Sequence, residues 1–233
     1  MEDEVIKHTK KIYASATDRN KAFIEKAREI AIEILIIVFA VSLSIWLHGW
    51  SEARHQQKEV KEFLLDLRED LDSDIVSMQS TNDLLQRNLG NFRFLGQLNK
   101  TQLDSIIQKN GSLEYSASVG TTKISSGDYE GFKSGGKIDL IENKELKKHI
   151  LKYYQERVPD ISEAEKLNAA QILKLTDFWN DNADRDYKTN FLDPKFESRI
   201  TTLLTITAND SDQYQTAISL AKEIIDEINK QYN

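Results

Sequence analysis

The stretch that decides the fold is IAIEILIIVFAVSLSIWLHGW, residues Ile30–Trp50. From Ile34 to Trp50 it contains no Asp, Glu, Lys or Arg. An α-helix rises about 1.5 Å per residue, so roughly 20 apolar residues cross the hydrocarbon core of a bilayer. We therefore predict a transmembrane helix over residues 30–50. It separates an N-terminal segment, residues 1–29, from a large domain, residues 51–233.

The charges on either side of this stretch predict its orientation. Residues 1–29 contain seven Lys and Arg, whereas residues 51–70 contain four of these cations and six acids. Cations are enriched on the cytoplasmic side of a membrane helix, so we expect residues 1–29 in the cytoplasm and residues 51–233 in the periplasm. The predicted location is the inner membrane, as a single-pass protein. A cleaved signal peptide has a similar charge order and is the alternative.

Three residues in the apolar stretch are candidates for interaction. Trp46 and Trp50 stand where an interfacial aromatic belt would contact the lipid bilayer. Glu33 is the one acid inside the stretch. It either carries a proton or pairs with a cation on another membrane helix, or it lies near the boundary and reaches headgroup water.

The composition favours helices and excludes several functions. The chain of 233 residues has two prolines, nine glycines and no cysteine, and its net charge is −7. Few Pro and Gly residues are typical of an all-α fold. The acidic balance argues against a nucleic-acid partner, and the absence of cysteine excludes disulfides and thiolate metal sites.

An apolar stripe continues beyond the membrane segment at steps of three and four residues. No Gly or Pro follows Ser51 until Gly90, so we predict that the membrane helix extends as a stalk to about Leu89. The stripe is either a coiled-coil interface of a homo-oligomer or a face covered by the protein's own later helices. Its residues are Val60, Leu64, Leu67, Leu71, Ile75 and Met78.

Later signals predict an antiparallel helical bundle. The segment of residues 111–136 holds six of the nine glycines and is expected to cap one end of the bundle. Asn143 is expected to start a helix that Pro159 ends, and Ser162 to Glu165 to start the next. Asp193-Pro194 predicts another start, and residues 209–211 a break. The expected core is Leu64, Leu67, Leu71, Leu146, Ile150, Leu175, Ile200, Leu203, Ile224 and Ile228.

Motif searches give no catalytic, cofactor or metal site. The Gly-rich run from Gly131 to Lys137 matches part of a phosphate loop, but Ile138 follows where a hydroxyl is required. The acidic residues 181–186 lack the Gly and the closing Glu of an EF-hand. The four histidines have no ligand spacing. We therefore expect no enzyme activity, no cofactor and no metal.

Two groups of residues together resemble a known family. The first comprises EILIIV at Glu33–Val38, Trp50-Ser51-Glu52, and LLDLREDLDSDI at Leu64–Ile75; the second is residues 126–154. This combination resembles an uncharacterised single-pass membrane protein family common in Bacteroidota, with a domain of unknown function. The resemblance implies an inner-membrane anchor and a periplasmic helical domain, and it implies no activity.

These observations lead to a non-catalytic envelope protein, an interaction or assembly module with a protein partner or a second copy bound through the transmembrane and stalk helices. One alternative is a ligand-sensing bundle with a pocket near Tyr153, Tyr154 and Trp179. Another is an accessory subunit of a membrane complex that uses Glu33. No second apolar stretch follows, so we do not expect this chain alone to signal across the membrane.

Overall fold

The computed structural model describes the backbone of residues 2–232 and the side chains of residues 23–25, 27, 28, 31, 32 and 34–232. Every regular element in this range is helical, which confirms the all-α prediction. Contacts divide the chain into two units, Met1–Gln56 and Gln57–Asn233. The elements are α1 (Glu2–Gln97), α2 (Lys100–Asn110), α3 (Gly127–Ser134), η1 (Ile138–Leu140), α4 (Lys144–Lys152), η2 (Tyr153–Arg157), α5 (Val158–Asp181), α6 (Tyr187–Phe191) and α7 (Pro194–Tyr232).

The first unit contains the apolar part of α1. Within the described residues, one helical stretch is long and apolar enough to cross a membrane; it begins at Ile34, and its most apolar window has a mean hydropathy of 1.9 and no buried area. Its large apolar side chains are 42% to 69% exposed between Ile34 and Trp50. The hydroxyl of Ser44 donates to the carbonyl of Ala40 at 2.9 Å, so this polar group is satisfied inside its own helix.

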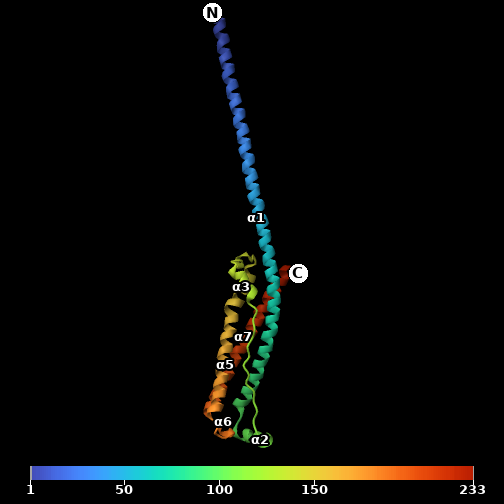
Figure 1. Ribbon diagram of the computed structural model, residues 1–233, viewed down its shortest axis with the longest axis vertical. Helices are drawn as coiled ribbons and strands as arrows, with labels where there is room; N and C mark the ends of the chain where they lie inside the picture. Colours follow the sequence, from blue (N-terminus) through green and yellow to red (C-terminus); the bar gives the residue numbers. More distant parts are fainter. Residues whose placement is uncertain (1, 233) are drawn as a thin grey trace. The chain divides into compact units, whose positions relative to one another are not determined.

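The second unit is a bundle of the α1 portion from Gln57 onward, α5 and α7 (Figure 1). Helices α1 and α7 run in opposite directions, because Arg68 bonds to Asn229 whereas Gln86, further along α1, bonds to Ser211. Helices α1 and α5 run in the same direction, so the chain must return along the bundle between them (Figure 1).

The return is made by residues 111–126, the first part of the Gly-rich segment 111–136; this extended segment runs along α1 (Figure 1). Near its start the Asn91 amide donates to the carbonyl of Ser116 at 2.8 Å, and near its end the Ser125 N–H donates to Asp74 Oδ1 at 2.8 Å. The expectation that residues 111–136 together cap one end of the bundle is therefore wrong for residues 111–126, whereas the remainder begins with helix α3. An extended chain can serve here because side chains of α1 satisfy its backbone polar groups.

The core consists of two clusters of buried apolar side chains. The first includes the predicted stripe from Val60 to Met78, and the second gathers Phe92 with residues of α5 and α7. The stripe is thus covered by the protein's own elements, one of the two alternatives that the sequence left open. All ten residues of the predicted core are buried, at 2% exposure or less.

Three predicted helix boundaries are absent: the stop at Pro159, the start at Ser162 to Glu165, which lies inside α5, and the break at residues 209–211. Helix α4 continues through the π-helical turn η2 into α5, so Pro159 does not end it. Pro159 has no N–H to donate to the carbonyl of Gln155, and its ring crowds the preceding helical turn. The π-helical turn, in which the Val158 N–H donates to the carbonyl of Tyr153, is wider and leaves room for the proline ring. Residues 209–211 likewise lie inside α7 rather than in a break.

Candidate functional site

Tyr153 and Tyr154, two predicted interaction residues, are core side chains. The Tyr153 hydroxyl donates to Asp74 Oδ2 at 3.1 Å, and the Tyr154 hydroxyl donates to the carbonyl of Ser125 at 3.1 Å. The Tyr154 ring stacks on Tyr129 with ring centres 4.2 Å apart. Burial raises the pKa of both phenols well above the ordinary value. Both residues tie α4 and η2 to α1 and to the extended segment.

Trp179, predicted to share a pocket with these tyrosines, lies in the other cluster. Its indole N–H donates to the hydroxyl of Tyr115, and burial raises the pKa of Tyr115 to about 12. Its ring packs edge-on against Phe191, with centres 5.0 Å apart. The structure therefore does not bring the three predicted residues into one pocket.

The membrane-segment candidates are exposed where the structure describes them. Trp46 is 64% exposed and Trp50 is 49% exposed. The Arg54 guanidinium lies 4.0 Å from the centre of the Trp50 ring, a cation–π contact one turn beyond the apolar stretch. The side chain of Glu33 lies outside the described residues.

A group of polar side chains that the sequence analysis missed lies in the middle of the bundle. Glu165, expected to start a helix, instead accepts from the Thr122 backbone N–H at 2.6 Å and from the Tyr214 hydroxyl. The Thr122 hydroxyl lies 2.8 Å from that of Tyr214 and 2.9 Å from that of Thr81. These contacts join α1, the extended segment, α5 and α7.

Beside this group lies a buried amide–carboxyl pair. The Asn168 amide donates at 3.2 Å both to Asp210 Oδ2 and to the Thr207 hydroxyl. Asp210 is 1% exposed, and its Oδ1 and the Oδ1 of Asn168 have no hydrogen-bond partner. Desolvation, with a smaller contribution from the charge of Glu165, raises the pKa of Asp210 to about 6. The pair thus holds two acceptor atoms that lack a donor.

Asp210 also lines a hollow at the seam between α5 and α7. Its volume is about 300 Å³. Acidic and apolar side chains make up most of its lining, with two amides. The lining residues are Asp160, Glu163, Ala164, Leu167, Ile206, Asn209, Asp210 and Gln213.

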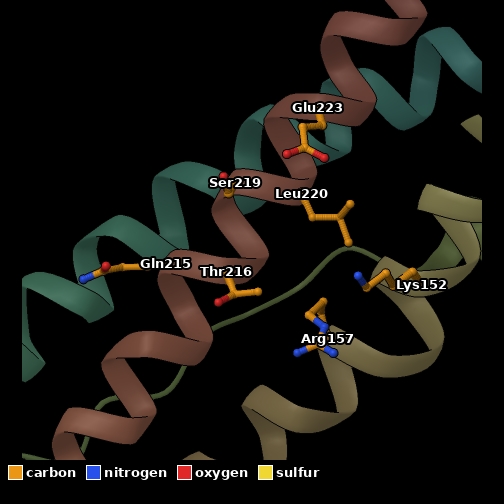
Figure 2. Close-up of a pocket in the computed structure, with 7 residues that line it drawn as sticks. All are labelled: Lys152, Arg157, Gln215, Thr216, Ser219, Leu220 and Glu223. Carbon is orange, nitrogen blue, oxygen red and sulfur yellow. The ribbon is translucent and has the colours of Figure 1, made fainter.

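A second hollow, of about 420 Å³, lies between α7 and the segment formed by the end of α4 and η2, and it is drawn in Figure 2. Lys152 and Arg157 lie across the gap from Thr216 and Leu220 of α7, and Gln215 points away (Figure 2). Arg157 Nη1 lies 3.1 Å from Asp160 Oδ2, so the guanidinium marks the boundary between the basic and the acidic hollow. The first hollow is therefore lined by three acids, whereas the second carries two cations, Lys152 and Arg157, and one acid, Glu223.

In the part of the chain that the structure describes, no group of three His, Asp or Glu residues is arranged to hold a metal ion. Comparisons with protein-family models, with curated proteins and with solved structures find no significant match to the chain. The assignment of function therefore depends on the chain's own geometry. The sequence signal for the seam was Asn168, a polar residue interrupting the apolar face of α5.

Proposed function

We propose that the chain is a non-catalytic inner-membrane protein, anchored by residues 30–50, whose periplasmic residues 51–233 form an interaction or assembly module. The observation that carries this proposal is the contrast between the two units. Large apolar side chains remain exposed from Ile34 to Trp50, whereas the second unit buries its own apolar stripe. The resemblance to the Bacteroidota single-pass family agrees with it.

The physical argument concerns the cost of that exposure. Burying a Leu, Ile, Val or Phe side chain is worth about 1.5–3 kcal/mol relative to leaving it in water. A continuous exposed helix of such residues is therefore stable in a bilayer or against a partner's membrane helix, where backbone polar groups are satisfied within the helix. The apolar stripe of the second unit needs neither lipid nor a partner helix, because the unit's own elements already cover it.

Orientation is tested by labelling single cysteines, which the cysteine-free chain makes unambiguous. Asp184→Cys places a thiol at an exposed position of the second unit, and Ser15→Cys places one before the membrane segment. In intact spheroplasts a membrane-impermeant maleimide is expected to label only the Asp184→Cys chain, and lysis should expose the other. The reverse pattern, or a soluble product trimmed near Ser51, would overturn the anchored orientation.

The interaction role is tested by purification in a mild detergent. We expect the chain to co-purify with a partner or to migrate as an oligomer. Trp46→Ala and Trp50→Ala separate lipid anchoring from partner binding, because they remove interfacial side chains without touching the core of the second unit. A monomer that retains no partner would contradict an assembly role.

A second candidate function, ligand sensing, is favoured by the two hollows along α7, one beside α5 and one beside α4 and η2. The predicted residues Tyr153, Tyr154 and Trp179 do not form the site, so the candidate moves to residues that face the seam. A sensing role predicts that a ligand stabilises the protein thermally and that substitutions in the seam remove this stabilisation.

A further inference from the structure

We propose that the acidic hollow between α5 and α7 binds a small organic cation, a primary ammonium group on a short apolar body, with Asp210 as its main acceptor. This inference deepens the ligand-sensing candidate and rests on that candidate alone. The cation site does not depend on the orientation in the membrane. Thermal unfolding tests the site, whereas cysteine labelling tests the membrane anchor, so either proposal can fail without the other.

Two oxygen atoms of the buried amide–carboxyl pair lack a hydrogen-bond donor. Asp210 is 1% exposed and Asn168 is 3% exposed, yet the Oδ1 atoms of both have no donor. Buried polar atoms in folded proteins nearly always have a partner, and leaving a carboxylate oxygen without one costs free energy. An ammonium group donates three hydrogen bonds and carries the charge that Asp210 lacks nearby.

The surrounding charge and apolar surface define the ligand further. Glu163 lies exposed at the hollow and adds a second negative charge, whereas Asp160 is held by Arg157 at 3.1 Å. Leu167 and Ile206 line the same space, and Leu167 is 49% exposed. A cation with a few carbon atoms would cover this apolar surface, which a bare inorganic ion cannot do.

Size and coordination also favour an organic cation over a metal. The volume of about 300 Å³ is at the lower end of the range for small-molecule sites. A calcium ion requires about six to eight oxygen ligands. Within the described residues, no group of three His, Asp or Glu is placed to hold a metal. Of the buried pair's two residues with an unpaired oxygen, only Asp210 lines the hollow, and one buried carboxyl suits an ammonium group.

Binding should depend on pH, since a proton and the ligand would compete for Asp210. Its pKa is raised to about 6, first by desolvation and then by the charge of Glu165. Below that pH the affinity is expected to fall about tenfold per pH unit, and above it to level off. The other titratable or charged groups near the pair are Arg157, Asp160, Glu163 and Tyr214.

The test is thermal unfolding of the full chain in detergent, followed by tryptophan fluorescence, with n-butylammonium chloride as the probe. At a pH above 7 we expect a saturable rise of several degrees in Tm, absent with equal concentrations of sodium or magnesium chloride. Asp210→Asn should remove the shift. Asp212→Asn, an exposed acid two residues away on the same helix, should retain it.

Leu167→Lys provides a second variant that does not alter the buried pair. It places a cation at the rim of the hollow. The protein should remain folded, and at least ten times more probe should be needed for the same rise in Tm. The site would be overturned if the probe did not raise the Tm of the unaltered chain. It would also be overturned if Asp210→Asn and Leu167→Lys showed the same rise in Tm as the unaltered chain. A shift that equal sodium chloride reproduces would also overturn it, because it would report ionic strength only.

Discussion

Two aspartates are buried in the second unit, and they differ in how their oxygen atoms are satisfied. Asp74 is 0% exposed and accepts from the Ser125 N–H through one oxygen and from the Tyr153 hydroxyl through the other. Asp210 is equally buried but accepts only from Asn168, through one oxygen. Both oxygens of Asp74 are therefore satisfied, although desolvation still raises its pKa, whereas Asp210 keeps one acceptor without a donor at a cost in stability.

That cost predicts a pH-dependent gain for Asp210→Asn. The folded-state pKa of Asp210 is raised to about 6 from 3.8, so the folded protein binds the proton more tightly than the unfolded chain. Stability is therefore complete below about pH 4 and is lost as the pH rises to about 6, by roughly 2–3 kcal/mol. Urea unfolding should show Asp210→Asn more stable than the unaltered chain above pH 7 and nearly equal to it at pH 4. A variant less stable at both pH values would contradict this.

The two buried tyrosines should differ in the effect of losing a hydroxyl. Tyr153→Phe leaves Asp74 Oδ2 without a donor in the core and is expected to cost about 1–3 kcal/mol. Tyr154→Phe removes a bond to the carbonyl of Ser125 from a ring that stays stacked on Tyr129, and should cost about 1 kcal/mol or less. Chemical denaturation of both variants checks the order. The opposite order would show that the Asp74 contact does not contribute to stability.

At the residue scale, the sequence predicts apolar burial well and polar burial poorly. Leu64 or Ile224 is recognised as core because its own helix repeats apolar residues at the right spacing. Asp210 and Ser211 have the local preferences of turn residues. Their partners come from other elements: Asn168 on α5 for Asp210, and Asn82 and Gln86 on α1 for Ser211. No periodicity within one helix reveals these partners.

The part of α1 from Gln57 onward and α7 supply the largest shares of the buried core residues. Leu71 is 0% exposed within the first cluster, whereas Val76 on the same helix is 67% exposed. Leu71→Ala is expected to cost about 2–5 kcal/mol through lost burial and the cavity left behind. Val76→Ala is the matched control and should change stability by less than about 0.5 kcal/mol. Equal effects in denaturant melts would show that the stripe is not packed in this way.

The extended segment is a second element whose role can be tested. The Asn88 side chain donates to the carbonyl of Ser118 at 2.7 Å and accepts from the Ser118 N–H at 3.3 Å. It thus makes the two backbone hydrogen bonds that a neighbouring β-strand would otherwise make. At Gly120 a Cβ would lie 2.7 Å from Thr81 Cγ2, which requires a shift. Asn88→Ala should speed amide hydrogen exchange over residues 116–122 while leaving α7 protected. Unchanged exchange there would contradict the role of Asn88.

Local sequence signals predicted some helix boundaries correctly and others wrongly. The Asn143 cap was correct: its side chain accepts from the Leu146 N–H at 3.1 Å. The Asp193-Pro194 start of α7 was also correct. Pro159 failed as a stop signal, because a π turn absorbs its ring within a continuous helix. Residues 111–126 failed as part of a cap, because the α1 side chains that bind their backbone lie far away in the sequence.

For the whole molecule, the two core clusters predict that the second unit folds without the apolar stretch. All buried residues of both clusters lie between Val60 and Ile228. A chain beginning at Ser51 should be soluble, monomeric and highly helical, with a cooperative thermal transition. Circular dichroism and size-exclusion chromatography measure this. An aggregated or unfolded product would show that this domain depends on the membrane segment.

The pairing of α1 with α7 has a consequence for biogenesis. The first long helix to leave the ribosome is covered by the last, so the apolar face from Val60 to Met78 waits until residues 194–232 have been translated. At about 5–20 residues per second this delay is on the order of ten seconds. During that interval the apolar face of α1 is exposed on the nascent chain, and it is the segment that a holdase chaperone would bind.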